Sequence, residues 1–303
     1  MAVNNKKLII VQGPTASGKT ALSIALAKHF NTEIISGDSR QFYQEMIIGT
    51  ARPNIEELSM VKHHFISSHS VLDEFNTLDF SLKAREICAN LFETKDQVIL
   101  VGGSGMYLDA LTFGLDEIAA DERIRQSLNQ TFENDGLDVL VNELRIKDPE
   151  FCLSADLKNP VRVIRALEVI RMTNQPFSSL RKGFKNDLPY DIVRFSIDWK
   201  REHLYDRINL RVDEMIANGL VNEVKGLQQF QSFSPLKTLA YSEIFEVLDN
   251  KCSLETAIEK IKQHTRNYAK RQMTWLRRYS DVNYIDPYSK DTLISQAIAK
   301  MSD

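Results

Sequence analysis

The chain has 303 residues, of which 43% are hydrophobic and 26% are charged, with a formal net charge of −3. This composition is typical of a globular protein with one large or two modest domains, and the charge excludes a protein that binds nucleic acid through overall charge alone. Three widely spaced cysteines, the absence of a leader-like N-terminus and the absence of a run of ~18 apolar residues predict a cytoplasmic protein without a membrane span.

The first 115 residues alternate between strand-like and helix-like segments. Strands are expected in KLIIVQG (7–13), TEIISGDS (32–39) and DQVILVGGSG (96–105), and helices in 19–30 and 77–95. Near-continuous apolar runs such as QVILV are typical of parallel sheets that are covered on both faces. This part of the chain therefore predicts an α/β core.

From residue 116 the pattern becomes helical, and strand character returns in DIVRFSIDW (191–199). Long helices are then expected in 201–219 and 253–279, the first ending at a Gly219 cap. We predict an α/β fold in which 1–115 and 195–303 form a core with a parallel sheet flanked by helices, and 116–194 form an inserted helical domain.

GPTASGKT follows the first strand and opens the first helix, which is the context that a G-x-x-x-x-G-K-[ST] phosphate-binding loop (P-loop) requires. Its backbone amides and the helix N-terminus favour an anion, Lys19 would neutralise a phosphate, and Thr20 would bind Mg²⁺. The predicted diphosphate-binding residues are Gly13, Pro14, Thr15, Ala16, Ser17, Gly18, Lys19 and Thr20. The motif indicates a diphosphate or triphosphate, and it does not specify a nucleotide.

Two polar residues follow predicted strands at the edge of the sheet where ligands bind. Asp38 comes directly after the second strand, and Ser104 follows the third, which ends in glycines and lacks the acidic residue typical of a nucleotide hydrolase. Asp38 is expected to face the phosphate loop. Helix capping is the alternative role for both side chains.

Basic residues concentrate in two helical segments. NPVRVIRALEVIR places Arg162, Arg165 and Glu168 at a spacing of three, where a solvated face is an equally good interpretation. The segment 260–278 contains seven Lys or Arg residues and no acidic residue, and one helical stripe combines cations with aromatics (His264, Tyr268, Arg271, Trp275 and Arg278). This second pattern favours an RNA surface, unless the aromatic residues belong to the core.

Taken in order, several segments resemble the tRNA dimethylallyltransferase (IPP transferase) family over nearly the whole chain. They are GPTASGKT, EIISGDSRQFY, IGTARP, ILVGGSGMYLDAL, NPVRVIRALEV, YDRINLRVDEMIANGLVNEV and AKRQMTWLRR. The resemblance implies a P-loop NTPase-like core and transfer of a dimethylallyl group from dimethylallyl diphosphate to the N6 amine of the adenosine beside the tRNA anticodon. It also implies a Mg²⁺ ion and release of diphosphate.

By the same resemblance, Asp38 is the catalytic base, Ser104 contacts the reacting centre, and Lys19 and Arg165 act on the leaving group. The implied tRNA contacts are Asp38, Ser39, Arg40, Gln41, Ser104, Arg125, Arg162, Val163, Ile164, Arg165 and Ala166, and the basic helix adds Arg271, Trp275 and Arg278. The expected partners are tRNA and dimethylallyl diphosphate, and the expected state is a monomer.

The sequence departs from the family pattern in three places. Arg52 replaces a lysine in IGTARP and keeps the charge. Ala240-Tyr241 replaces a glycine-tyrosine pair, so the sequence does not predict the geometry of the turn there. No Cys/His pair with zinc-finger spacing is present, and His63-His64 are expected to be structural because adjacent residues of an extended segment point to opposite faces.

Three other functions remain open at this point. A kinase that binds ATP would also use the nucleotide-binding loop and Asp38, but it leaves the basic-aromatic helix unexplained. A prenyltransferase acting on free adenylate would share the loop and the base but would not need the helical insertion. An RNA-binding protein without enzymatic activity would need no intact GKT loop.

Overall fold

The computed structural model describes residues 6–116, 118–181 and 188–302. The chain divides into two compact units, one made of Met1–Thr112 with Asp187–Asp303 and the other of Phe113–Asn186. The predicted insertion, 116–194, differs at both ends from the second unit, because α4 ends at Phe113 and a strand that pairs in the sheet already begins at Asp191. No helix in the described ranges is both long and apolar enough to cross a bilayer.

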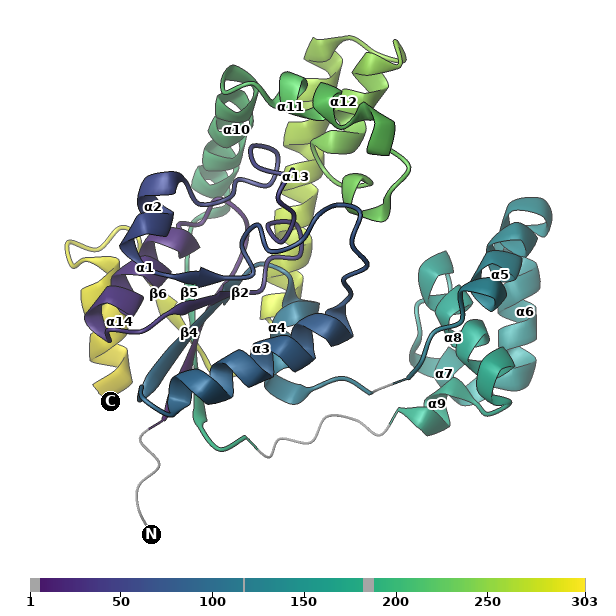
Figure 1. The fold of residues 1–303 in the computed structure, drawn as a ribbon, viewed down its shortest axis with the longest axis horizontal. Coiled ribbons are helices and arrows are strands. Elements are labelled where there is room, and N and C mark those ends of the chain that lie inside the picture. Colours follow the sequence, from purple (N-terminus) through teal and green to yellow (C-terminus); the bar gives the residue numbers. More distant parts are fainter. Residues whose placement is uncertain (1–5, 117, 182–187, 303) are drawn as a thin grey trace. The chain divides into compact units, whose positions relative to one another are not determined.

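The first unit is built on a six-stranded sheet whose paired neighbours all run parallel (Figure 1). The strand order is β3-β2-β4-β1-β5-β6. Their bounds are β1 Lys7–Gln12, β2 Ile34–Ser36, β3 His63–His64, β4 Gln97–Gly102, β5 Asp191–Ile197 and β6 Val282–Ile285. The predicted α/β class with a parallel sheet is confirmed, whereas the short β3 and the late strand β6 were not predicted.

Alternate residues of the central strand β1 enter two hydrophobic layers, as the twofold period of a strand requires. Leu8 and Ile10 belong to the larger core, and Ile9 and Val11 to the smaller core that includes Leu22 of α1. The helices of this unit are α1 Lys19–His29, α2 Ile55–Met60, α3 Thr77–Phe92, α4 Gly105–Phe113, α10 Arg201–Ala217, α11 Leu220–Gly226, α12 Tyr241–Leu248, α13 Leu254–Leu276 and α14 Leu293–Ser302. Two single-turn 3-10 helices, η1 Gln228–Phe230 and η2 Ser234–Leu236, precede α12.

The second unit is helical and has a core of its own. Its helices are α5 Glu122–Asp135, α6 Leu137–Lys147, α7 Pro149–Ser154, α8 Pro160–Thr173 and α9 Phe177–Leu180. The α8 helix starts with an Asn159 cap, Pro160 in its first turn and a buried apolar stripe, and it packs against α5 and α6. Three predicted tRNA contacts, Val163, Ile164 and Ala166, are buried in this core, so their side chains present no surface to a nucleic acid.

One sequence departure and one predicted helix cap are visible in the backbone angles. Ala240, at the position of the usual glycine, has a φ of 72° and caps the N-terminus of α12. An L-residue is strained in that region, so the surrounding packing must hold the turn that a glycine would adopt freely. The Gly219 cap is also observed, with a φ of 97° just beyond α10.

Candidate active site

The phosphate loop lies between the end of β1 and the start of α1. Gly13, Ala16 and Gly18 have φ values of 138°, 62° and 94°, which turn the backbone around the space in front of the helix N-terminus. A side chain at position 13 would lie 2.8 Å from Ser196 Oγ, so this glycine is needed for close approach to β5 as well as for its dihedral angle. The loop thus has the cradle geometry and the helix dipole that bind phosphate.

Residues from the C-terminal half of the chain hold this loop in place. Trp199 Nε1 donates to Ser17 O at 2.8 Å, and Arg207 Nε donates to Ala16 O at 2.8 Å. Gln272 of α13 accepts from Thr15 N at 2.8 Å and donates to Gly103 O at 2.9 Å, which joins the phosphate loop to the turn after β4. A Cβ on Gly103 would lie 2.1 Å from Gln272 Nε2. These contacts fix the loop before any ligand binds.

Sequence reasoning missed Arg207, Arg211 and Gln272. The two arginines lie four residues apart on α10, so both occupy one face of the helix that follows β5, and Arg211 Nη1 donates to Thr15 Oγ1 at 3.4 Å. That spacing, directly after a strand of the sheet, was the available signal. Gln272 lay within the quoted AKRQMTWLRR segment, but only the cations and aromatics of that segment were considered.

The cations at this loop have no acidic partner within ion-pair distance among the described residues. Burial lowers the pKa of Lys19 to about 8, although Asp38 acts in the opposite direction. Burial is also the main cause that lowers the pKa of Arg211, and neighbouring Arg207 lowers it further. Lys19 Nζ donates to Pro14 O at 2.6 Å. Partly buried cations that repel each other are stabilised by an anionic ligand, so Lys19 and Arg211 favour one at this site.

Asp38 follows β2 at the same edge of the sheet. Its Oδ1 atom accepts from Arg40 N at 3.1 Å, and Oδ2 makes no hydrogen bond or ion pair with any described residue. Ser39 Oγ and Ser104 Oγ are 3.5 Å apart, which brings the ends of β2 and β4 together. The pKa of Tyr268 is raised by burial and then by the charge of Asp38, so this phenol from α13 belongs to the same site.

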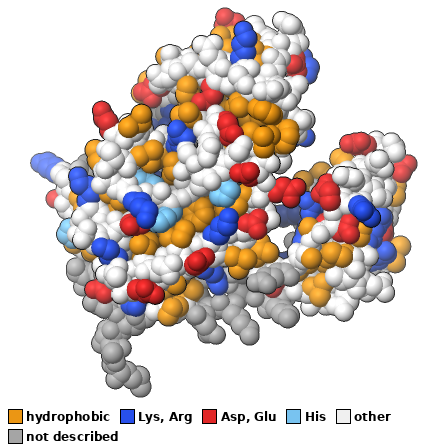
Figure 2. All heavy atoms as spheres, in the orientation of Figure 1, with side chains coloured by type: hydrophobic (Ala, Val, Ile, Leu, Met, Phe, Trp, Pro, Cys, Tyr) orange, Lys and Arg blue, Asp and Glu red, His pale blue; other side chains and the backbone are white. Residues whose placement is uncertain are grey.

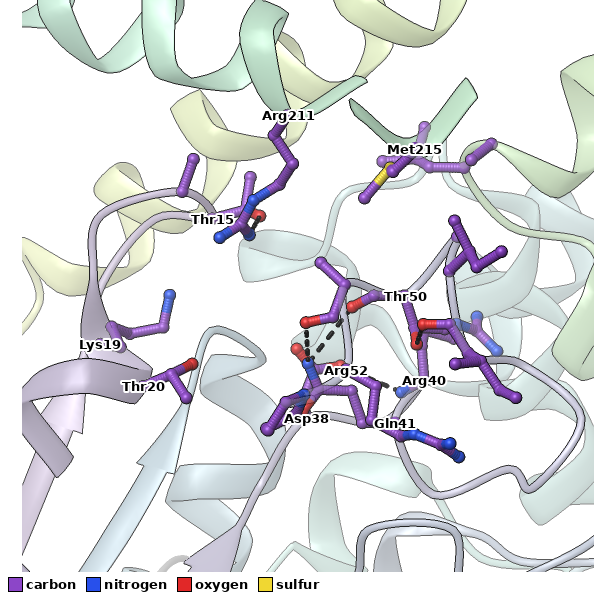
Figure 3. Close-up of a pocket in the computed structure, with 18 of the residues that line it drawn as sticks. Thr15, Lys19, Thr20, Asp38, Arg40, Gln41, Thr50, Arg52, Arg211 and Met215 are labelled. Carbon is purple, nitrogen blue, oxygen red and sulfur yellow. Dashed lines mark hydrogen bonds between the residues drawn. The ribbon is translucent and has the colours of Figure 1, made fainter. Parts of the chain in front are cut away.

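A cavity of about 1480 Å³ connects these groups, and all of its lining residues belong to the α/β unit. In Figure 3, Lys19 and Thr20 lie on one side and Asp38, Gln41, Thr50 and Arg52 on another, with Arg211 and Met215 on a third. The volume exceeds the 300–1,000 Å³ usual for a small-molecule pocket. It therefore has room for a diphosphate ester and a nucleoside together.

The predicted basic-aromatic stripe of α13 divides into buried and exposed positions. Tyr268 lines the cavity, and the indole of Trp275 packs so closely on Gly105 that a Cβ there would lie 2.2 Å away. Arg271 and Arg278 are exposed and lie over the rings of Tyr268 and Trp275 at 5.6 and 4.5 Å. Tyr268 and Trp275 are thus partly buried without belonging to a hydrophobic core, which the alternative interpretation required, and the cations beside them are accessible.

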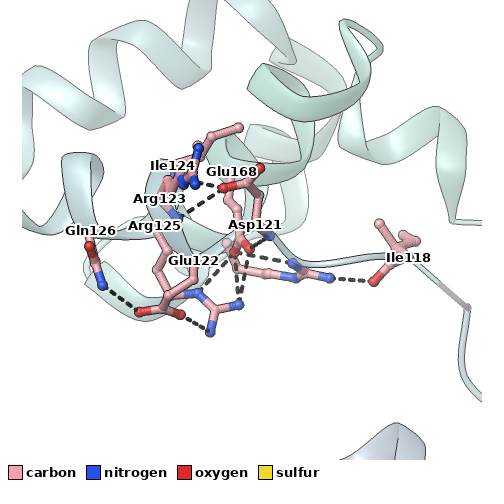
Figure 4. Close-up of polar contacts among 9 residues, drawn as sticks. Ile118, Asp121, Glu122, Arg123, Ile124, Arg125, Gln126 and Glu168 are labelled. Carbon is pink, nitrogen blue, oxygen red and sulfur yellow. Dashed lines mark hydrogen bonds and ion pairs between the residues drawn. The ribbon is translucent and has the colours of Figure 1, made fainter.

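The arginines of the helical unit surround a carboxylate instead. Glu168 is fully buried. Its carboxylate accepts hydrogen bonds from Arg125 Nη2 at 3.1 Å and from the amide of Asp121 at 2.9 Å, and it forms an ion pair with Arg165 Nη1 at 3.1 Å (Figure 4). Arg165 Nη2 also donates to Ile118 O at 2.8 Å. Arg125 and Arg165, both predicted to contact tRNA, therefore pair with Glu168 inside the protein, while Arg162 is exposed.

Four other polar residues noted in the sequence, Arg40, Gln41, His63 and His64, have hydrogen-bond partners within the protein. Arg40 Nη1 donates to Pro235 O at 3.3 Å, and Gln41 Nε2 donates to Thr50 O and Ala51 O at 3.2 Å each. His64 Nε2 contacts Glu33 Oε2 at 2.6 Å, and His63 Nδ1 contacts Val61 O at 2.8 Å, so the two histidines have separate partners. On the face shown in Figure 2, basic and acidic side chains are interspersed.

Comparison with known proteins assigns the family. Residues 41–279 match the family model described as IPP transferase. A tRNA dimethylallyltransferase from Christiangramia forsetii is 45% identical over 280 residues, which cover 92% of this chain and 93% of the relative. Another from Azobacteroides pseudotrichonymphae is 42% identical, and the match covers 94% of each chain. The chain belongs to the IPP transferase family, as the ordered motifs predicted.

Two solved structures extend this similarity to the fold. The tRNA isopentenylpyrophosphate transferase from Bacillus halodurans has a TM-score of 0.72 at 36% identity, covering 98% of this chain and 96% of that one. A eukaryotic dimethylallyltransferase acting on tRNA has a TM-score of 0.81 at 28% identity and covers 98% and 78% respectively. The α/β core and the order of its elements are therefore those of a known class of transferases.

Proposed function

We propose that this chain transfers a dimethylallyl group from dimethylallyl diphosphate to the N6 amine of the adenosine beside the anticodon of tRNA, and that diphosphate is released. Family membership supports the reaction class. One structural observation carries the proposal: a single cavity contains both the anion-binding loop, with Lys19, and a carboxylate opposite it, that of Asp38.

The leaving group is held by the phosphate loop and by the cations around it. As the bond between the allyl C1 and its oxygen breaks, negative charge accumulates on the diphosphate, and the loop amides, Lys19 and Arg211 stabilise that charge. The backbone of the loop is fixed beforehand by Trp199 and Gln272, so it needs little reorganisation during the reaction. The phosphate is in this case a leaving group, and the carbon chain is the group transferred.

A Mg²⁺ ion fits the donors present at the loop. The Thr20 hydroxyl has no hydrogen-bond partner among the described residues, and Ser17 Oγ is buried and unpartnered in the same loop. Mg²⁺ commonly uses one or two protein oxygens together with substrate phosphate oxygens and water. When bound there, the ion would supply charge neutralisation to the diphosphate, with Thr20 as the proposed protein ligand.

Asp38 is the proposed general base. The adenosine amine is a weak nucleophile because its lone pair is delocalised into the ring, and a carboxylate can accept its proton as the new bond forms. The free Oδ2 atom is available for this, while the Arg40 amide holds Oδ1. Ser104 remains a proposed contact of the same reacting centre, and its hydroxyl lies 3.5 Å from that of Ser39, which lines the cavity.

We propose that tRNA docks through the exposed cations of α13, Arg271 and Arg278, and through Arg162 of the helical unit. Arg125 and Arg165 remain proposed contacts, but only their exposed edges are available because Glu168 occupies the rest. The target base must leave its stack to reach the cavity, as other base-modifying enzymes require. With tRNA as substrate, we expect a cytoplasmic location and, for the catalytic unit, a monomer.

The experiment that tests the reaction combines the protein, Mg²⁺ and labelled dimethylallyl diphosphate with either unmodified tRNA or AMP. We expect label in tRNA only. Label in AMP would assign the protein to the free-nucleotide class, and ATP hydrolysis without prenyl transfer would indicate a kinase-like use of the loop.

The Asp38→Ala variant tests the base. We expect the turnover number to fall by about 10²–10⁴-fold because the proton acceptor is lost, while tRNA affinity stays within about twofold. Single-turnover kinetics and tRNA filter binding on the same preparation separate the two effects. Weakened tRNA binding with an unchanged rate at saturation would contradict the assignment.

A further inference from the structure

One wall of the cavity is a short loop, residues 47–51, that carries an internal anion. Glu223 of α11 accepts from three successive backbone amides, with Oε2 3.2 Å from Ile47 N and 2.8 Å from Ile48 N, and Oε1 3.1 Å from Gly49 N. Three amides converging on one carboxylate form an anion nest, filled here by the protein itself. The amides are therefore not available to the substrate, and the loop takes its shape from Glu223.

The carboxylate is itself held by Tyr241. The phenol donates to Glu223 Oε1 at 2.6 Å, and burial together with that carboxylate raises the pKa of Tyr241, so the phenol remains a donor. Tyr241 is fully buried and follows the strained turn at Ala240. Its ring lies against the loop so closely that a Cβ on Gly49 would be 2.4 Å from Cε2. The loop is thus fixed by hydrogen bonds and by direct packing.

The opposite side of the loop is held by Gln41, whose Nε2 atom donates to Thr50 O and Ala51 O. The loop lies beside Asp38 in the cavity, across from Lys19 (Figure 3). With the diphosphate at Lys19 and the amine at Asp38, the five-carbon allyl chain has to lie between them. The cavity lining includes apolar side chains from the loop, such as Ile48, and from α10, such as Ile208, Val212 and Met215.

We propose that Glu223 and Tyr241 are positioning residues for the prenyl transfer, which hold the 47–51 loop at the distance that fits a five-carbon allyl chain. The inference rests on the proposed function. Releasing the loop from Glu223 would leave three amides without their acceptor, and the loop would move to satisfy them with water. The cavity would then fit dimethylallyl diphosphate less closely and tolerate a longer chain better.

The test measures kcat and KM for dimethylallyl diphosphate and for the ten-carbon geranyl diphosphate, at saturating tRNA. For Glu223→Ala we expect kcat/KM for the five-carbon substrate to fall on the order of 100-fold, which is the usual effect of misplacing reacting groups by ~1 Å. The preference for five over ten carbons should fall at least about tenfold. Glu223→Gln keeps the shape and one acceptor oxygen and should retain about a tenth of the activity, and Tyr241→Phe should lose only about tenfold or less.

Asp148→Ala is the matched control. This buried carboxylate of the helical unit also accepts from backbone amides and a hydroxyl, those of Phe151 and Ser178, but it does not line the cavity. The Asp148→Ala variant should have lower thermal stability. Its preference for the five-carbon over the ten-carbon diphosphate should stay within twofold of the wild type. If Glu223→Ala does not fold, the Gln and Phe variants decide the question.

Two failures are distinguishable. If the wild-type protein does not prenylate tRNA, the proposed function fails. If it does, but the Glu223 and Tyr241 variants keep the chain-length preference and the KM of the wild type, as Asp148→Ala does, the positioning role is wrong and Glu223 only stabilises the fold.

Discussion

Two clusters of cations, one in each unit of this protein, have opposite surroundings. In the helical unit, Arg125 and Arg165 surround the fully buried Glu168, so their charge is matched inside the protein. At the phosphate loop, Arg207, Arg211 and Lys19 have no acidic partner within ion-pair distance among the described residues, and the pKa values of Arg211 and Lys19 are lowered. Removing one partner of a matched buried pair destabilises the fold, whereas partly buried cations without a carboxylate partner mark a place for an anionic ligand.

The largest expected effect comes from removing the carboxylate of the helical unit. Glu168→Ala leaves two arginines and the Asp121 amide without their acceptor, and breaking a buried ion pair from one side typically costs about 3–5 kcal/mol of unfolding free energy. Calorimetry should detect the loss. As a control, Glu143→Ala removes a partly exposed carboxylate paired with Arg171 and Lys147 and should cost about 0–1 kcal/mol.

Removing a cation at the phosphate loop should affect ligand binding and leave the fold largely intact. Arg211→Ala relieves the repulsion from Arg207, so we expect unchanged or slightly raised thermal stability together with an affinity for diphosphate that is roughly 100-fold weaker. Isothermal titration with diphosphate and Mg²⁺ measures it. A variant that unfolded readily while binding diphosphate normally would remove the distinction between the two regions.

The pH dependence of binding follows from Lys19. Its pKa in the free protein is about 8, below the usual 10.5, so its positive charge is lost as the pH rises through 8. Diphosphate affinity should therefore fall about tenfold between pH 7 and pH 9, since about nine-tenths of the lysine is charged at the first pH and about a tenth at the second. Lys19→Arg keeps its charge and should show no such fall. The same fall in that variant would point to another group.

The smallest effect is expected for cations that are exposed on the surface. Replacing Arg271 and Arg278 of α13 by alanine should leave diphosphate binding unchanged and lower stability by about 1 kcal/mol at most, because Arg278 Nη1 lies 4.0 Å from Asp109 Oδ2. The slope of log tRNA affinity against log salt should become shallower by about 1.4–1.8, because two phosphate contacts are lost. Filter binding between low and physiological salt measures this slope, and an unaltered value would exclude both residues from the tRNA surface.

Local sequence signals were sufficient to predict the core strands of the sheet, the phosphate loop and the position of Asp38. The strands β1 and β4 were predicted from apolar runs, the loop from its motif, and Asp38 from its place after β2. Residues whose role depends on distant contacts were missed: Gln272 meets Thr15 across 257 positions, and Glu223 meets Ile48 across 175. Glu168 looked like part of a polar helix face, since its spacing does not reveal that its carboxylate is covered.

The contacts of the phosphate loop also have a consequence for the order of folding. Residues 13–20 leave the ribosome well before β5, Trp199, Arg207 and Gln272, which complete their surroundings and follow some 180–260 positions later. At about 5–20 residues per second, the loop waits roughly 10–50 s for these partners. Because the central strand β1 pairs with β4 and then with the still later β5, most contacts of the sheet are nonlocal and form slowly. The phosphate loop is therefore synthesised long before its native surroundings are complete.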